Sequence, residues 1–117
     1  MAVFFELIKN IVRPVTRLYP HTKSEVPKGF RGMPLYDMSK CLGCGLCERD
    51  CPSAAIEMVG KGKEAEFTVF LDRCAFCSQC ADSCPVSAVT LTDSYELARF
   101  ERDDLIIRFR RSRLPES

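Results

Sequence analysis

The chain has 117 residues, of which 46% are hydrophobic and 28% are charged. This length has room for one domain with extensions rather than two independent cores, because a domain typically takes about 100 to 150 residues. The 17 basic and 16 acidic residues leave a formal net charge of +1, so the composition gives no electrostatic basis for binding nucleic acid.

The first residues predict an amphipathic helix over Val3–Leu18, which Pro14 should kink or split. Lys9, Arg13 and Arg17 form its basic face. The apolar residues recur at helical spacing: Phe4, Leu7, Ile8, Ile11, Val12, Val15 and Leu18. A partner subunit or a membrane surface would cover them, and packing on the chain's own domain is the alternative.

This start does not look like a secretory signal, because Glu6 and Lys9 interrupt the stretch that should be continuously apolar. A reducing, cytoplasmic setting is therefore expected. No run of residues approaches the roughly 18 apolar positions of a membrane-spanning helix. Any membrane contact is expected to be peripheral or to pass through a partner.

Two similar runs organise the middle of the chain. Cys41–Pro52 reads C-L-G-C-G-L-C-E-R-D-C-P, and Cys74–Pro85 reads C-A-F-C-S-Q-C-A-D-S-C-P. The flanking residues also match, Tyr36 with Val69 among them, so a whole supersecondary unit is duplicated. Each unit predicts a strand, a cysteine loop, a short helix around the third and fourth cysteines, and a second strand. We expect two such units to pack as a small, pseudo-two-fold α+β domain.

All eight cysteines lie in these runs, whereas disulfide frameworks spread their cysteines to join distant loops. All-cysteine zinc sites also use C-x2-C pairs, but they leave no role for the third cysteine or for the proline. A [4Fe-4S] cluster needs four thiolates, and C-x2-C-x2-C supplies three of them. The runs therefore predict two [4Fe-4S] clusters, and the α+β domain is expected to be a bicluster ferredoxin-like one.

The fourth cysteine of each run is expected to bind the cluster of the other run, as in two-cluster ferredoxins with this C-x2-C-x2-C-x3-C-P pattern. This rule gives two sets of ligands. The first cysteine set is Cys41, Cys44, Cys47 and Cys84. The second cysteine set is Cys51, Cys74, Cys77 and Cys80. Gly43 and Gly45 should let the first loop bend around sulfur with free N–H groups. Phe76 and Ser78 take their places in the second loop, which predicts a more apolar pocket there.

No catalytic residue is predicted. His21, the only histidine, stands beside Pro20 and is interpreted as an exposed or packing side chain, with a proton or partner role as the alternative. No nucleophile is paired with a base, and no glycine-rich nucleotide loop occurs. The chain is interpreted as an electron relay.

The C-terminal part predicts a helical extension over residues 94–109. Its apolar residues are Tyr95, Leu97, Ala98, Leu105, Ile106, Ile107 and Phe109. A basic tail follows, made of Arg108, Arg110, Arg111 and Arg113, which either meets anionic lipid or an acidic partner or is simply solvated. The predicted division is a docking segment over 1–35, a cluster domain over 36–92 and an extension over 93–117.

Together with the cysteine runs, two flanking segments resemble the two-cluster ferredoxin-like subunit of respiratory complex I and its counterparts in energy-converting membrane-bound hydrogenases and related ferredoxin-dependent complexes. These segments are Tyr19–Gly32, which ends in Phe-Arg-Gly, and Thr92–Ala98, which contains Tyr-Glu-Leu-Ala. The similarity covers roughly Leu18 to Leu105.

This resemblance implies an electron-transfer subunit in the peripheral arm of an ion-translocating oxidoreductase, on the cytoplasmic face of the cell membrane. Its clusters would connect an electron donor to a neighbouring cluster-bearing subunit, and its N-terminal helix would meet the membrane arm. The short loop between the repeats resembles the hydrogenase-type or sulfur-reducing archaeal complexes, which implies reduced ferredoxin as donor. The alternatives are a soluble two-cluster ferredoxin that diffuses freely and an interaction module with purely structural clusters.

Overall fold

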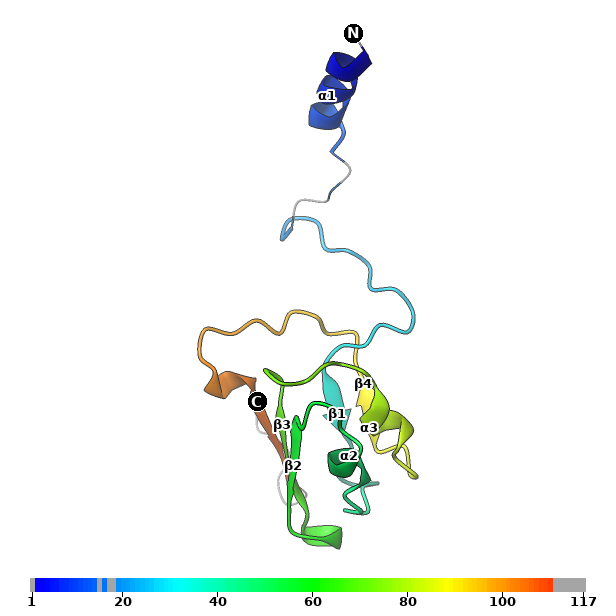
Figure 1. Cartoon of the computed structure of the whole chain (residues 1–117), viewed down its shortest axis with the longest axis vertical. Helices are drawn as coiled ribbons and strands as arrows, with labels where there is room; N and C mark the ends of the chain where they lie inside the picture. The colour runs from blue at the N-terminus through cyan, green and yellow to red at the C-terminus, as the bar shows by residue number, and fades with distance from the viewer. Residues whose placement is uncertain (1, 15, 17–18, 111–117) are drawn as a thin grey trace.

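The fold is that of a computed structural model, which describes residues 2–14, 16 and 19–110. It is a mixed helix and sheet domain preceded by a separate helix (Figure 1). The elements follow in the order α1 (Ala2–Val12), β1 (Pro34–Tyr36), α2 (Leu46–Arg49), β2 (Ile56–Val59), η1 (Gly62–Glu64), β3 (Glu66–Phe70), α3 (Gln79–Asp82), β4 (Val89–Leu91), η2 (Asp103–Leu105) and β5 (Ile106–Phe109).

The duplicated unit has the predicted strand–helix–strand order. The first unit contains β1, α2 and β2, and the second contains β3, α3 and β4. β1 pairs antiparallel with β4, while β2 pairs antiparallel with β3. The first strand of each unit therefore pairs with the second strand of the other, so that neither unit completes a sheet by itself.

The core lies between the two small sheets. Along β3 the side chains alternate between buried and half-buried, as the period of a strand dictates, and Phe67 and Val69 are the largest fully buried ones among the described residues. Tyr36 stacks on the Phe67 ring with the centroids 5.5 Å apart. Ile56 and Val89 complete this core from the other strands.

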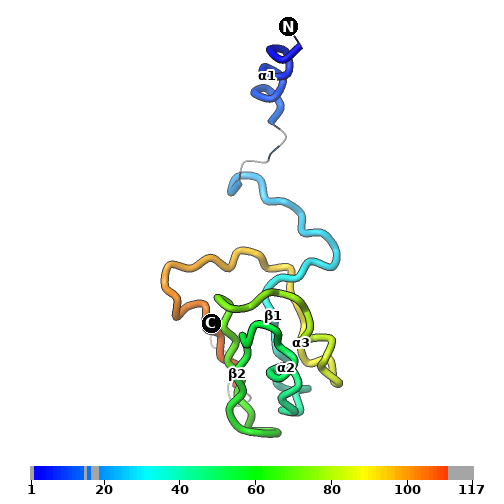
Figure 2. Tube along the Cα trace, viewed as in Figure 1, coloured from blue at the N-terminus to red at the C-terminus, as the bar shows by residue number. Residues whose placement is uncertain are grey.

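The predicted N-terminal helix is present as α1, which ends two residues before Pro14. Its predicted continuation to Leu18 includes positions outside the described residues. Every described side chain of α1 is exposed, including Phe4, Leu7 and Ile11. Figure 2 shows residues 19–33 as a connection without helix or strand that leads to β1. Within the described ranges, no helix has the length and apolarity needed to cross a bilayer.

The predicted C-terminal helix over residues 94–109 is wrong. Residues 94–102 have no helix or strand, and β5 then joins the edge of β3 as the third strand of the sheet. The run Leu105-Ile-Ile suits a pleated strand because β-branched side chains favour extended backbone. Arg102 pairs with Asp72 at 2.7 Å before β5, and Arg110 pairs with Glu66 at 2.8 Å after it. Arg111 and Arg113 lie outside the described residues.

Candidate cluster sites

Two hollows in the domain separate the eight cysteines into two groups. One hollow, with about 390 Å³ of empty space including open solvent, is lined by the second cysteine set, Cys51, Cys74, Cys77 and Cys80. The other, with about 320 Å³ on the same measure, is lined by the first cysteine set, Cys41, Cys44, Cys47 and Cys84. Each hollow thus takes three cysteines from one run and the fourth from the other. This grouping is the one that the crossed rule predicts.

The two cysteine loops share an unusual backbone conformation. Gly43 and Gly45 have φ of 65° and 75°, and their repeat equivalents Phe76 and Ser78 have φ of 50° and 67°. This left-handed region costs a residue with a side chain about 1 to 2 kcal/mol. In the second loop both Phe76 and Ser78 have this unfavourable conformation, which indicates that the loop shape is required around the hollow. The predicted difference in polarity between the two pockets is wrong. Ser53 and Ser78 line the second-set hollow beside Phe76, whereas the first-set hollow is lined by apolar side chains such as Leu42, Leu46 and Val86.

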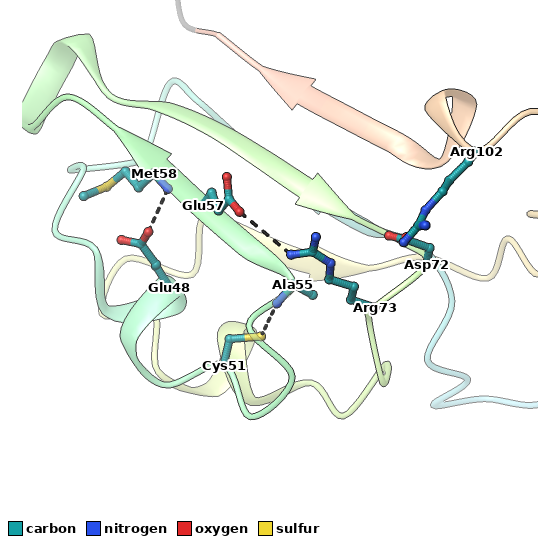
Figure 3. A network of polar contacts seen from close by, with 8 residues as sticks. All are labelled: Glu48, Cys51, Ala55, Glu57, Met58, Asp72, Arg73 and Arg102. Carbon is teal, nitrogen blue, oxygen red and sulfur yellow. Dashed lines mark hydrogen bonds and ion pairs between the residues drawn. The ribbon is translucent and has the colours of Figure 1, made fainter.

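Backbone N–H groups donate to cysteine sulfur in both units. The N–H of Gly43 donates to Cys41 Sγ at 3.4 Å, as expected for this loop. After each helix, an alanine N–H donates to the fourth cysteine: Ala55 to Cys51 Sγ at 3.4 Å (Figure 3), and Ala88 to Cys84 Sγ at 3.2 Å. Such donors stabilise negative charge on sulfur, which both thiolates and reduced clusters carry.

Burial opposes the effect of these N–H donors, because it disfavours the charged thiolate form of the cysteines inside the hollows. It raises the pKa of Cys47 to about 12 and also raises the pKa values of Cys74 and Cys80. At Cys51 burial also favours the thiol, but the N–H groups of Ala55 and Ser53 outweigh it and leave the pKa below its usual value. Since iron binds thiolate, loading these sites must release protons from the buried thiols.

The glycines of the first loop have a packing role that the sequence did not reveal. A Cβ on Gly43 would lie 2.2 Å from the carbonyl oxygen of Gly62, so the turn at η1 can approach the loop only where no side chain intervenes. The N–H of Gly62 donates to the Gly43 carbonyl at 3.5 Å in this contact. At Gly45 a Cβ would lie 3.0 Å from Met58 Cε. The connection between the repeats therefore braces the first loop.

Side-chain contacts also tie the cysteine segments to the strands, as Figure 3 shows. Glu48 Oε1 on α2 accepts a hydrogen bond of 3.0 Å from the N–H of Met58 on β2. Arg73, directly before Cys74, lies 3.9 Å from Glu57. Arg73 also stacks over the Phe70 ring at 4.6 Å. The Glu48 contact joins the helix of the first unit to the sheet shared by both units.

The two flanking segments that carry the family resemblance lie side by side. The N–H of Gly32 donates to the Thr92 carbonyl at 2.9 Å, and the N–H of Met33 donates to the Ser94 carbonyl at 3.3 Å. A Cβ on Gly32 would lie 2.3 Å from the Thr92 oxygen, which explains the glycine. Arg31 reaches the carbonyl of Cys77 at 3.3 Å. His21, by contrast, is exposed in a turn.

Tyr36 is a site residue that the sequence reasoning did not identify as such. It lines both hollows and is only 6% exposed, and its hydroxyl has no hydrogen-bond partner among the described residues. A buried hydroxyl without a partner is costly, so an acceptor is expected inside a hollow. The thiolate and sulfide sulfurs of an iron–sulfur cluster are such acceptors, and the residues present therefore fit this group.

Comparison with known proteins places this geometry among iron–sulfur subunits. Residues 20–88 match the family described as 4Fe-4S dicluster domain. NADH-quinone oxidoreductase subunit I of Carboxydothermus hydrogenoformans is 38% identical over 99 residues, which cover 80% of this chain and 71% of the relative. F(420)H(2) dehydrogenase subunit I of Methanosarcina mazei is 47% identical over 53 residues, which cover 44% of this chain and 30% of the relative.

A solved structure is also similar. A chain in the structure of the membrane-bound sulfane sulfur reductase, described as an archaeal respiratory membrane complex, has a TM-score of 0.69 and 33% identity. The similarity covers 86% of this chain and 55% of that chain. This chain spans about half the length of several curated relatives, such as NAD(P)H-quinone oxidoreductase subunit I of a Synechococcus strain, of which it covers 50% at 39% identity.

Proposed function

Because the chain belongs to the 4Fe-4S dicluster domain family, and so carries two [4Fe-4S] clusters, we propose that it relays electrons through both clusters within a membrane-bound oxidoreductase complex. When bound, each cluster accepts and donates one electron without bond cleavage in the protein. The residues of this chain hold the clusters, orient N–H groups toward sulfur and exclude part of the solvent. The observation that carries the proposal is the grouping of eight cysteines around two hollows.

We assign one cluster to the first cysteine set and the other to the second. The lining of the two hollows supports this crossed assignment, and so do the matched N–H donors at Cys51 and Cys84. Crossing also gives a reason for the duplication, because each unit supplies only three ligands to its own cluster.

We propose further that the two units are related by a pseudo-two-fold axis. The exchanged strand pairing supports it, since β1 pairs with β4 in the same way that β2 pairs with β3. The backbone angles add support at residues outside the cysteine loops, because Ala54 and its repeat equivalent Ser87 both have φ of 49°.

The surroundings proposed for the chain are the peripheral arm of an ion-translocating complex, on the cytoplasmic face of the membrane. The named relatives and the sulfur-reducing structural neighbour belong to oxidoreductases, and the neighbour is a respiratory membrane complex. The exposed apolar residues of α1 support a contact with the membrane arm or the membrane surface. Reduced ferredoxin is the donor that we propose, by analogy with hydrogenase-type and sulfur-reducing complexes.

We also propose a division of the chain into three segments with different roles. Residues 1–35 would dock on the partner subunits, residues 36–92 would hold the clusters, and residues 93–117 would form an extension. β5 of that extension contributes a strand to the cluster domain's sheet, so the extension would also brace the domain.

The test is to purify the native protein anaerobically from its own membranes and to quantify iron, sulfide and co-purifying subunits. About eight irons together with membrane subunits would support the relay. A co-purifying nickel subunit would favour the hydrogenase-type complex over a sulfur-reducing one. The same iron content on a lone soluble monomer would instead identify a diffusing ferredoxin and would overturn the proposed complex.

A further inference from the structure

Tyr36 occupies a position between the two cluster sites. It is the last residue of β1, and it is aligned with Val89 of β4 in the sheet that joins the two units. Its side chain lines the hollow of the first cysteine set and also that of the second. A change at this one residue can therefore reach both sites.

Two aromatic neighbours hold the Tyr36 ring. The Phe67 ring lies 5.5 Å away and nearly parallel, with an interplanar angle of 18°. The Phe109 ring lies 5.1 Å away at 43°. Phe67 comes from β3, and Phe109 comes from the C-terminal strand β5, which was predicted as a helix. Contacts with these two rings restrict the Tyr36 ring, so the fold sets where its hydroxyl oxygen lies.

The hydroxyl is a proton donor that needs an acceptor. Among the described residues it is the one buried side-chain nitrogen or oxygen atom without a hydrogen-bond partner. A tyrosine hydroxyl keeps its proton at neutral pH, and the cysteine sulfurs that line the two hollows are acceptors for its hydrogen bond.

The sulfurs that act on the hydroxyl come mainly from the second cysteine set. Cys80 and Cys51 line the second-set hollow together with Tyr36, and Cys80 interacts with the hydroxyl more strongly than Cys47 of the first set does. The repeat adds a further asymmetry. The equivalent of Tyr36 in the second unit is Val69, a fully buried residue with no donor. The duplicated domain thus has this hydroxyl only once.

We propose that the Tyr36 hydroxyl donates a hydrogen bond to a sulfur of the cluster held by the second cysteine set, and makes that cluster easier to reduce. A donor at sulfur stabilises the additional negative charge of the reduced state more than it stabilises the oxidised state. One electron is added, the proton stays on the tyrosine oxygen, and no bond breaks. The inference rests on the proposed cluster assignment and adds a cause of inequality between the two clusters.

The test compares the full chain with its Tyr36→Phe variant, both loaded with two clusters. We expect the potential of the second-set cluster to become more negative in an anaerobic titration followed by electron paramagnetic resonance. Resonance Raman bands of iron–sulfur stretching shift in deuterated water when hydrogen-bond donors exchange, and this shift should become smaller in Tyr36→Phe, with the backbone N–H donors retained. Tyr95→Phe is the matched control, because it removes the hydroxyl of a tyrosine that is 39% exposed. It should leave both readouts unchanged.

A second control separates hydrogen bonding from packing. Ile56→Val alters the packing of the second-set hollow but retains Tyr36 and both of its aromatic neighbours, so an equal change of potential in this variant would overturn the proposal. So would a Tyr36→Phe protein with both clusters and unaltered potentials. If Tyr36→Phe does not fold, a monofluorinated tyrosine at this position, a stronger donor of the same shape, should move the potential in the positive direction. An unchanged potential in the fluorotyrosine protein would then refute the hydrogen bond.

Failure of this inference is distinguishable from failure of the proposed function. Iron content and co-purifying subunits test the relay and do not depend on the tyrosine hydroxyl. Cys51→Ser tests the cluster assignment and also identifies which resonance signal belongs to the second cysteine set. The tyrosine variants then report on the hydrogen bond alone.

Discussion

Replacing Gly43 with alanine tests the close approach between the first cysteine loop and the turn at η1. The added Cβ would lie 2.2 Å from the Gly62 carbonyl oxygen and 2.7 Å from its nitrogen, at a position with φ of 65°. We expect the Gly43→Ala variant to be destabilised and to lose the first-set cluster more readily than the second.

The expected destabilisation of Gly43→Ala has two contributions. The left-handed backbone costs alanine about 1 to 2 kcal/mol relative to glycine. Relieving the overlap requires a shift of the η1 backbone, which costs about 1 to 3 kcal/mol by comparison with overpacked cores. Gly62→Ala is a matched control for the first part, since Gly62 has φ of 63° and nothing within 4 Å of its hypothetical Cβ.

The assay is the anaerobic unfolding rate of the cluster-loaded chain in fixed denaturant, followed by circular dichroism and by visible absorbance of the clusters. A rate is measured because cluster loss makes unfolding irreversible. The overlap term of about 1 to 3 kcal/mol corresponds to an unfolding rate about 5- to 150-fold higher for Gly43→Ala than for Gly62→Ala, since about 1.4 kcal/mol changes a rate tenfold. Equal rates for the two variants would refute the close approach.

Three further predictions concern the ligands, an N-terminal contact and α1. Cys51→Ser should convert the second-set cluster to a three-iron form or remove it while the first-set cluster persists, and resonance spectra showing selective damage to the first would refute the crossed assignment. The Tyr19 hydroxyl, 2.7 Å from Glu96, and Lys23 hold the pKa of that carboxyl below its usual 4.5, so this contact persists at neutral pH and is lost only as the pH falls through that lowered pKa. Glu96→Gln should therefore speed hydrogen exchange around Tyr19 a few-fold at neutral pH, and unchanged exchange would contradict this contact. Leu7→Glu should reduce co-purification with membranes at unchanged iron content, whereas Asn10→Glu on the polar face should not, and equal losses would argue against an apolar docking face.

Much of the fold and of the site could be predicted from local patterns. The repeat of 33 positions from Cys41 to Cys74 predicts two equal units, and both have the expected strand, loop, helix and strand. Pro14 indicates where α1 can no longer continue, because proline cannot supply the backbone donor of a helix interior. The cysteine spacing predicts the two clusters that the family comparison supports.

The C-terminal segment shows why the prediction fails elsewhere. Leu105, Ile106, Ile107 and Phe109 are apolar, and so short a run fits either a helix or a strand. The free edge of β3 decides between them, because β5 supplies it with hydrogen-bond partners and places Phe109 against Tyr36. That edge belongs to a sheet that contains strands of both units, so no local pattern contains it.

The sequence by itself determined the duplication and the number of clusters, and it predicted the two sets of cysteine ligands, because these depend on residue type and spacing. The tertiary structure alone decided which side chains surround the hollows, why Gly43 must be glycine, and that Tyr36 faces both sites. These features arise from contacts between segments far apart in the chain, such as Gly43 with Gly62 and Tyr36 with Phe109. Packing creates such contacts, and spacing along the chain does not record them.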